Sequence, residues 1–115
     1  MQLLPISLRK KIPPIYGQQA IRDPMVWAVF FNPVGAGTWF VTEFDPVSRM
    51  CFGFVSIHGD HDDELGYFSL AELEDIDIFV VGLSYPFGIE RDLHFSPKTL
   101  SAALAERNIY SFTPV

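Results

Sequence analysis

Three runs of apolar and aromatic residues follow one another with only short segments between them, and this pattern most constrains the fold. The runs cover residues 26–31, 38–44 and 50–57. Valine, phenylalanine and tryptophan favour strands, and the segments between the runs contain the Asn-Pro, Gly-Ala-Gly and Asp-Pro sequences typical of turns. Connections this short join antiparallel neighbours, because a parallel crossover needs about a dozen residues or more. The sequence therefore predicts an antiparallel meander.

Three further runs extend this pattern in the second half of the chain. Residues 65–68, 78–83 and 89–95 are rich in branched and aromatic side chains and are predicted as strands. Gly53, inside the third central run, indicates a β-bulge or a close neighbour. Together the runs predict an α+β fold with an antiparallel, largely meander sheet of about five strands.

Helices are expected at three places. Residues 4–12 carry apolar side chains at helical spacing and end before two prolines. Ser69 and Glu72 form a capping box that begins a short second helix. A serine followed by a proline begins a third helix over residues 96–107. We expect the N-terminal and C-terminal helices to pack on the sheet, and the aromatic tail over residues 108–115 to dock or to add an edge strand.

The composition is that of a globular protein. The chain has 115 residues, of which 49% are hydrophobic and 19% are charged, and this excludes a disordered polypeptide. The length predicts a single domain over residues 1–115. Cys51 is the only cysteine, so no internal disulfide can form and a reducing, cytoplasmic setting is expected. The sequence contains no apolar run long enough for a membrane helix, and no cofactor is predicted.

The net charge of −6 argues against direct binding of nucleic acid. Phosphate recognition requires a basic surface, and the densest basic cluster is Arg9, Lys10 and Lys11. A nucleic-acid-binding accessory protein that uses this cluster with aromatic stacking is therefore the weakest of three functional hypotheses.

Acidic residues dominate one long interval of the chain. No lysine or arginine lies between Arg49 and Arg91. The candidate binding residues in this interval are Asp62, Asp63, Glu64, Glu72, Glu74 and Asp75. A surface of this kind attracts basic partners, including proteins that normally hold nucleic acid, although acidic residues also serve solubility alone. The leading hypothesis is a non-enzymatic protein-interaction module that binds an unidentified basic protein through this acidic face.

The loop before residue 64 holds weak candidates for metal ligands. His58, Asp60 and His61 combine imidazole and carboxylate groups at short spacing. The spacing does not match a calcium-binding loop, because Leu65 stands where such a loop requires glycine. A solvated acidic loop is the simpler interpretation, and no metal site is predicted.

A second polar group lies in the run 89–95. Strand alternation would place Glu90, Asp92 and His94 on one face. Two carboxylates and an imidazole on one face can carry out acid–base chemistry, so the competing hypothesis is a small, metal-assisted hydrolase or nuclease. The simpler alternative is that the two acids face water.

Glu43 is predicted to be partly buried. Alternation in the run 38–44 would place it on the same face as Trp39 and Val41. A buried carboxylate needs a partner, and we expect an ion pair between Arg91 and either Glu43 or Glu64.

Three phrases of the sequence are similar to a known family. They are LRKKIPPIY (8–16), ELGYFSLAELE (64–74) and GIERDLHFSP (88–97). In these phrases the chain resembles the family known as domain of unknown function 2958, from which residues 75–86 depart by additional apolar side chains. The resemblance implies a small bacterial protein of a kind often carried by plasmids, integrative elements and phages. It implies no catalytic residue, because the family has no established activity.

Overall fold

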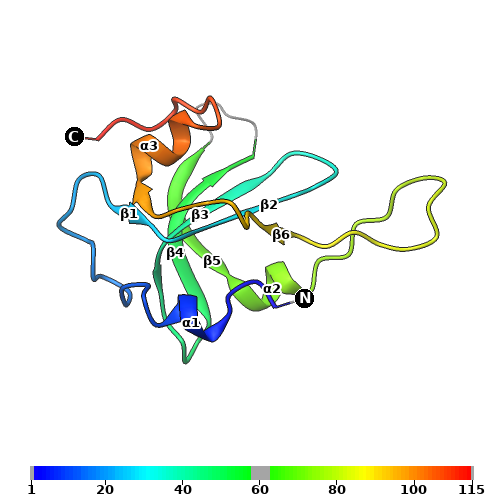
Figure 1. The fold of residues 1–115 in the computed structure, drawn as a ribbon, viewed down its shortest axis with the longest axis horizontal. Coiled ribbons are helices and arrows are strands. Elements are labelled where there is room, and N and C mark those ends of the chain that lie inside the picture. The colour runs from blue at the N-terminus through cyan, green and yellow to red at the C-terminus, as the bar shows by residue number, and fades with distance from the viewer. Residues whose placement is uncertain (1, 58–62, 115) are drawn as a thin grey trace.

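The computed structural model describes residues 2–57 and 63–114. It contains a five-stranded antiparallel sheet with the strand order β5-β4-β3-β2-β6, and a two-stranded sheet of β1 and β7 (Figure 1). The strands are β1 (Met25–Val26), β2 (Ala28–Phe31), β3 (Thr38–Phe44), β4 (Met50–Ser56), β5 (Glu64–Ser69), β6 (Glu90–Arg91) and β7 (Lys98–Thr99). The helices are α1 (Ile6–Arg9), α2 (Leu70–Glu74) and α3 (Leu100–Ala105).

The α+β class and the meander are confirmed. Strands β2 to β5 pair in chain order through antiparallel ladders, as their short connections predict. Strand β6 then returns to the opposite edge and pairs with β2. The serine half of the predicted capping box forms, because the Ser69 hydroxyl accepts a hydrogen bond from the Glu72 main-chain N–H at 3.2 Å.

Several boundaries differ from the prediction. The run 26–31 is divided at Trp27, because β1 pairs with β7 while β2 pairs with β3. The run 89–95 keeps only two paired residues, since the chain turns at Asp92, whose carboxylate accepts a hydrogen bond from the His94 main-chain N–H at 2.9 Å. The last helix begins at Leu100, because the two residues before it belong to β7.

The two faces of the large sheet bury separate clusters of apolar side chains. Leu4 from the N-terminal segment and Leu70 from α2 pack with Phe30 and Phe44 on one face. On the other face α3 packs against the sheet through these buried residues: Val29, Phe40, Phe54, Leu100 and Leu104. The tail docks on this second face, since the ring of Phe112 lies edge-on at 5.7 Å from that of Phe54.

A β-bulge in β3 determines which face receives Glu43. Val41 pairs with Gly53, but Glu43 pairs with Phe52, so Thr42 is an extra residue in the ladder. The bulge reverses the alternation after Thr42. Glu43 therefore lies on the face of Phe52, and the prediction that it shares a face with Val41 is wrong.

Gly53 is required at this bulge, as its position in the run predicts. A Cβ atom on Gly53 would lie 1.7 Å from the carbonyl oxygen of Phe40. Only glycine allows the two backbones to approach this closely, so the bulge in β3 and the glycine in β4 form one structural unit.

Candidate functional site

Glu43 anchors the loop that precedes β1. Its side chain is only 4% exposed. One carboxylate oxygen accepts a hydrogen bond from the Tyr16 main-chain N–H at 2.9 Å, and the other accepts one from the Gln18 N–H at 2.8 Å. The predicted pairing with Arg91 is wrong: no salt bridge joins Arg91 to Glu43 or to Glu64, all three of which lie in the described part of the chain. Main-chain donors satisfy Glu43 instead.

Gln18 fastens the same loop to β3. Its buried side-chain amide donates hydrogen bonds to the carbonyl oxygens of Met25 at 2.9 Å and Thr42 at 2.7 Å, and accepts one from the Met25 N–H at 2.7 Å. Tyr16, at the start of this loop, has a φ of 72°, in the left-handed region that non-glycine residues rarely occupy. The contacts of Glu43 and Gln18 hold the loop in this conformation.

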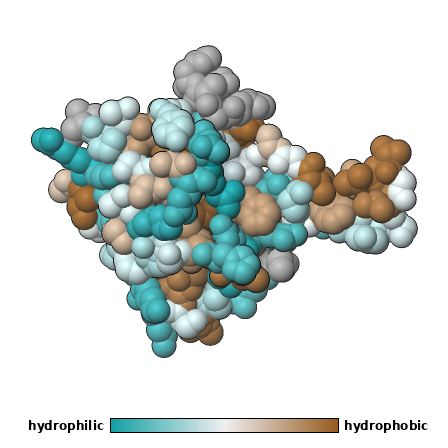
Figure 2. Space-filling view, turned by 45° about the horizontal axis from the view of Figure 1, so that its top comes forward, coloured by the Kyte–Doolittle hydropathy of each residue, from teal (hydrophilic) through white to brown (hydrophobic). Residues whose placement is uncertain are grey.

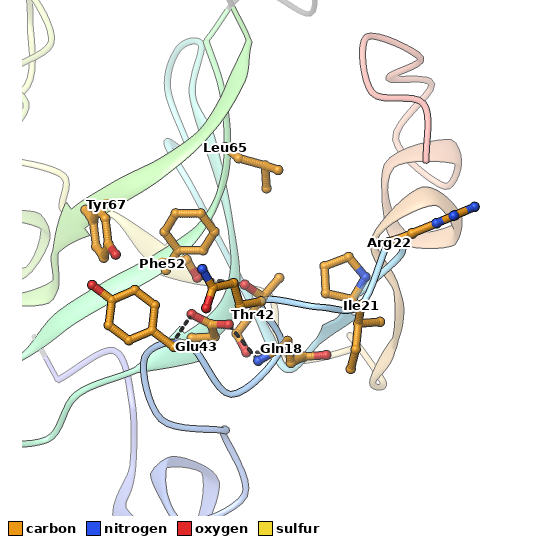
Figure 3. Close-up of a pocket in the computed structure, with 11 residues that line it drawn as sticks. Gln18, Ile21, Arg22, Thr42, Glu43, Phe52, Leu65 and Tyr67 are labelled. Atoms are coloured by element: carbon orange, nitrogen blue, oxygen red, sulfur yellow. Dashed lines mark hydrogen bonds between the residues drawn. The ribbon is translucent and has the colours of Figure 1, made fainter. Parts of the chain in front are cut away.

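A pocket of about 280 Å³ lies between this loop and the strands β3, β4 and β5. Glu43 and Thr42 line it from β3, and aromatic rings line it from three different elements (Figure 3). The ring of Phe52 meets that of Tyr67 edge-on, with the ring centroids 4.9 Å apart. The side chain of Tyr16 lies beside that of Tyr67, and this contact raises the pKa of Tyr67.

Arg22 and two aliphatic side chains complete the rim. Ile21 and Leu65 are largely exposed. The side chain of Arg22 extends away from Glu43 (Figure 3), and no ion pair joins the two. The charge of Glu43 is therefore balanced only by neutral N–H donors among the described residues.

The polar residues predicted near β6 have separate surroundings. One carboxylate oxygen of Asp92 accepts a hydrogen bond from Arg107 at 3.0 Å. Glu90 lines a small hollow together with Leu3, and the side chain of His94 is exposed. All three predicted residues are described, and neither a hydrogen bond nor an ion pair joins their side chains to one another. Within residues 2–57 and 63–114, no three acidic, histidine or cysteine side chains form a group able to hold a metal.

The predicted acidic residues also divide into different environments. Asp63 is buried, and accepts hydrogen bonds from the hydroxyl groups of Ser56 at 2.8 Å and Ser111 at 2.9 Å. Glu74 pairs with Arg49 and accepts a hydrogen bond from the main-chain N–H of Leu3 at 2.7 Å. The exposed members are Glu64, Glu72 and Asp75. The remaining candidates, which lie outside the described residues, are His58, Asp60, His61 and Asp62.

Residues 78–87 form a projecting arm between α2 and β6 (Figure 1). The predicted strand 78–83 is wrong, because this segment joins no other strand among residues 2–57 and 63–114. Ile78 instead exchanges two main-chain hydrogen bonds of 2.7 Å with Phe87 of the same arm. Phe79 is 73% exposed and Val81 is fully exposed. Leu83 and Tyr85 are exposed as well, and Figure 2 shows the hydrophobic side chains gathered on the projection. The arm thus places apolar side chains in water.

Sequence reasoning identified Glu43 but missed the pocket around it. Tyr16 and Tyr67 each belong to a phrase that resembles the family, and this was the available signal. Gln18 carries no local pattern, because its role depends on contacts with Met25 and Thr42 that only the folded chain makes.

Comparison with known proteins agrees with the resemblance in the sequence. None of the described helices is long and apolar enough to cross a bilayer. No curated protein and no solved structure matches the chain. The family model described as "Protein of unknown function (DUF2958)" matches residues 7–108. The chain therefore belongs to the DUF2958 family.

Proposed function

We propose that this protein is a non-enzymatic interaction module that docks its projecting arm into an apolar groove with a basic rim on a partner protein. This proposal rests on the exposed apolar side chains of the arm. Burying one such side chain stabilises a complex by about 1.5–3 kcal/mol, and clustered apolar side chains in water are typical of interaction sites.

The arm makes little contribution to the fold that displays it. In the part of the chain that the structure describes, its one ladder contact joins Ile78 to Phe87, and its tip lies away from the sheet that bears both apolar clusters (Figure 1). Of the arm, only Ile78 packs against either cluster. Side chains beyond this point are free to be buried by another molecule.

The charge around the arm selects the kind of partner. Glu72 and Asp75 are exposed at its base, and Asp77 adjoins it in the chain. No lysine or arginine occurs from residue 50 to residue 90. An anionic membrane would repel this region, because membrane-binding segments surround their apolar side chains with cations. A protein groove with a basic rim matches both the apolar tip and the acidic base.

Site-specific photo-crosslinking in native host cells tests the proposal. A photoreactive phenylalanine analogue replaces Phe79 in the arm, and the same analogue replaces Val47 as the control. Val47 is also highly exposed, at 91%, but lies in the turn between β3 and β4. We expect one discrete adduct from position 79 and none from position 47. The adduct should be lost in the Glu72→Gln/Asp75→Asn/Asp77→Asn variant, because that change removes the three exposed acidic charges at the base of the arm.

Two results would contradict the proposal. Equal adduct patterns from positions 79 and 47 would show that exposure alone causes crosslinking. An adduct that persists at full yield in the charge variant would exclude a partner with a basic rim. Thermal unfolding of each variant provides the control for folding, and all should unfold as the original chain does, since the altered side chains are exposed.

A further inference from the structure

We infer that the pocket between the Tyr16 loop and the sheet binds an organic cation, a guanidinium or an ammonium group. This site is distinct from the arm, and the inference does not depend on the proposed function. It rests on a buried carboxylate, on the aromatic rings beside it and on the size of the space that they enclose.

The carboxylate of Glu43 is hydrogen-bonded, but no cation among the described residues forms an ion pair with it. Glu43 is 4% exposed, and its hydrogen-bond partners in the part of the chain that the structure describes are the neutral N–H groups of Tyr16 and Gln18. A carboxylate has about four lone-pair positions, so about two remain after these bonds form. A cation in the pocket would meet a fixed, partly desolvated charge, where attraction is stronger than in bulk water.

Aromatic rings provide the complementary surface for a cation. Tyr16, Phe52 and Tyr67 line the pocket, and the faces of such rings attract guanidinium and ammonium groups. The edge-on contact of Phe52 with Tyr67 orients these two rings, and the main-chain hydrogen bond of Tyr16 to Glu43 fixes the third ring beside them. The arrangement is therefore already assembled without a ligand.

The dimensions and the charge of the pocket narrow the ligand class. A volume of about 280 Å³ lies just below the range of about 300–1,000 Å³ found for drug-sized ligands, so it suits one basic side chain or a small amine. An anion is disfavoured beside Glu43, because the carboxylate would repel it. Arg22 also lines the pocket, but its side chain extends away from Glu43 and leaves the carboxylate open to a second cation (Figure 3). The same chemistry can come from an arginine side chain of a protein or from a free diamine.

Titration followed by amide NMR tests the inference. The probes are capped arginine, putrescine and capped citrulline, a neutral compound of nearly the same shape as the arginine probe. We expect capped arginine or putrescine to shift the amide signals of Tyr16, Gln18 and Glu43, with an affinity at least tenfold above that of citrulline. Tighter binding of capped arginine would identify a protein side chain as the source, and tighter binding of putrescine a free amine. Equal binding of the cations and citrulline would overturn the inference.

Two tyrosines of similar exposure supply matched variants. Tyr67 is 53% exposed and lines the pocket, whereas Tyr85 is 57% exposed and lies in the arm. Tyr67→Leu should weaken cation binding at least fivefold, and Tyr85→Leu should leave it unchanged. Tyr67→Phe keeps a ring and should retain binding within about threefold. Unchanged affinity in Tyr67→Leu, or shifts confined to residues outside the pocket, would also overturn the inference.

Discussion

Replacing Glu43 by alanine should release the loop that begins at Tyr16 and destabilise the whole protein. The change removes both acceptors of the Tyr16 and Gln18 main-chain N–H groups. A buried donor without a partner costs about 1–3 kcal/mol. The Gln18 N–H bond is buried and should lose this full amount, whereas the bond from Tyr16 is only partly buried, so water can replace part of it. We therefore expect a loss of about 2–4 kcal/mol in the free energy of unfolding.

Urea unfolding followed by tryptophan fluorescence measures this loss, and hydrogen exchange at the Gln18 amide locates it. Glu64→Ala is the matched control, because Glu64 is an exposed glutamate on β5 whose side chain forms no ion pair with any residue that the structure describes. The control should change stability by less than about 0.5 kcal/mol. If Glu43→Ala behaves like Glu64→Ala, and exchange at Gln18 does not accelerate, the carboxylate does not hold the loop and our account of the site is refuted.

Two further perturbations test the sheet itself. Gly53→Ala places a Cβ atom against the Phe40 carbonyl, so the urea midpoint of unfolding should fall by the equivalent of roughly 3 kcal/mol. Gly66→Ala is the control and should be tolerated, because no atom lies within 4 Å of the added Cβ. Equal midpoints for the two variants would contradict the close approach at the bulge. Burial raises the pKa of the Cys51 thiol from 9.0 to about 12, so only the unfolded thiol ionises between these values and stability should fall as pH rises through this window. Urea unfolding should show a weaker decline in Cys51→Ala, and an identical decline would contradict the assignment.

Local pattern was sufficient to predict the central strands. The runs at 38–44 and 50–57 became β3 and β4 with almost unchanged bounds, because their strand-forming side chains and the turn sequences between them favour the same structure. The short connections then left antiparallel pairing as the available arrangement. Ser69 likewise needed only its neighbour Glu72 to begin α2.

Features that depend on distant contacts were predicted less well. Asp63 belongs to an acidic stretch of sequence, yet it is buried beneath Ser111, 48 positions further along the chain. Glu74 pairs with Arg49, which lies 25 positions earlier. Counting acidic residues in the sequence therefore overestimated the acidic surface of the folded protein, because folding buries some of these residues and pairs others with cations.

The sequence by itself determined that strands, turns and a capped helix form and that they follow one another in a meander, because these choices depend on neighbouring residues. Only the tertiary structure decided where Glu43 points. An alternation of period two continues until a bulge interrupts it, and this bulge exists because the β4 backbone at Gly53 approaches β3 closely. The pocket follows from that single displaced carboxylate, since it is Glu43 that holds Tyr16 and Gln18 against the sheet.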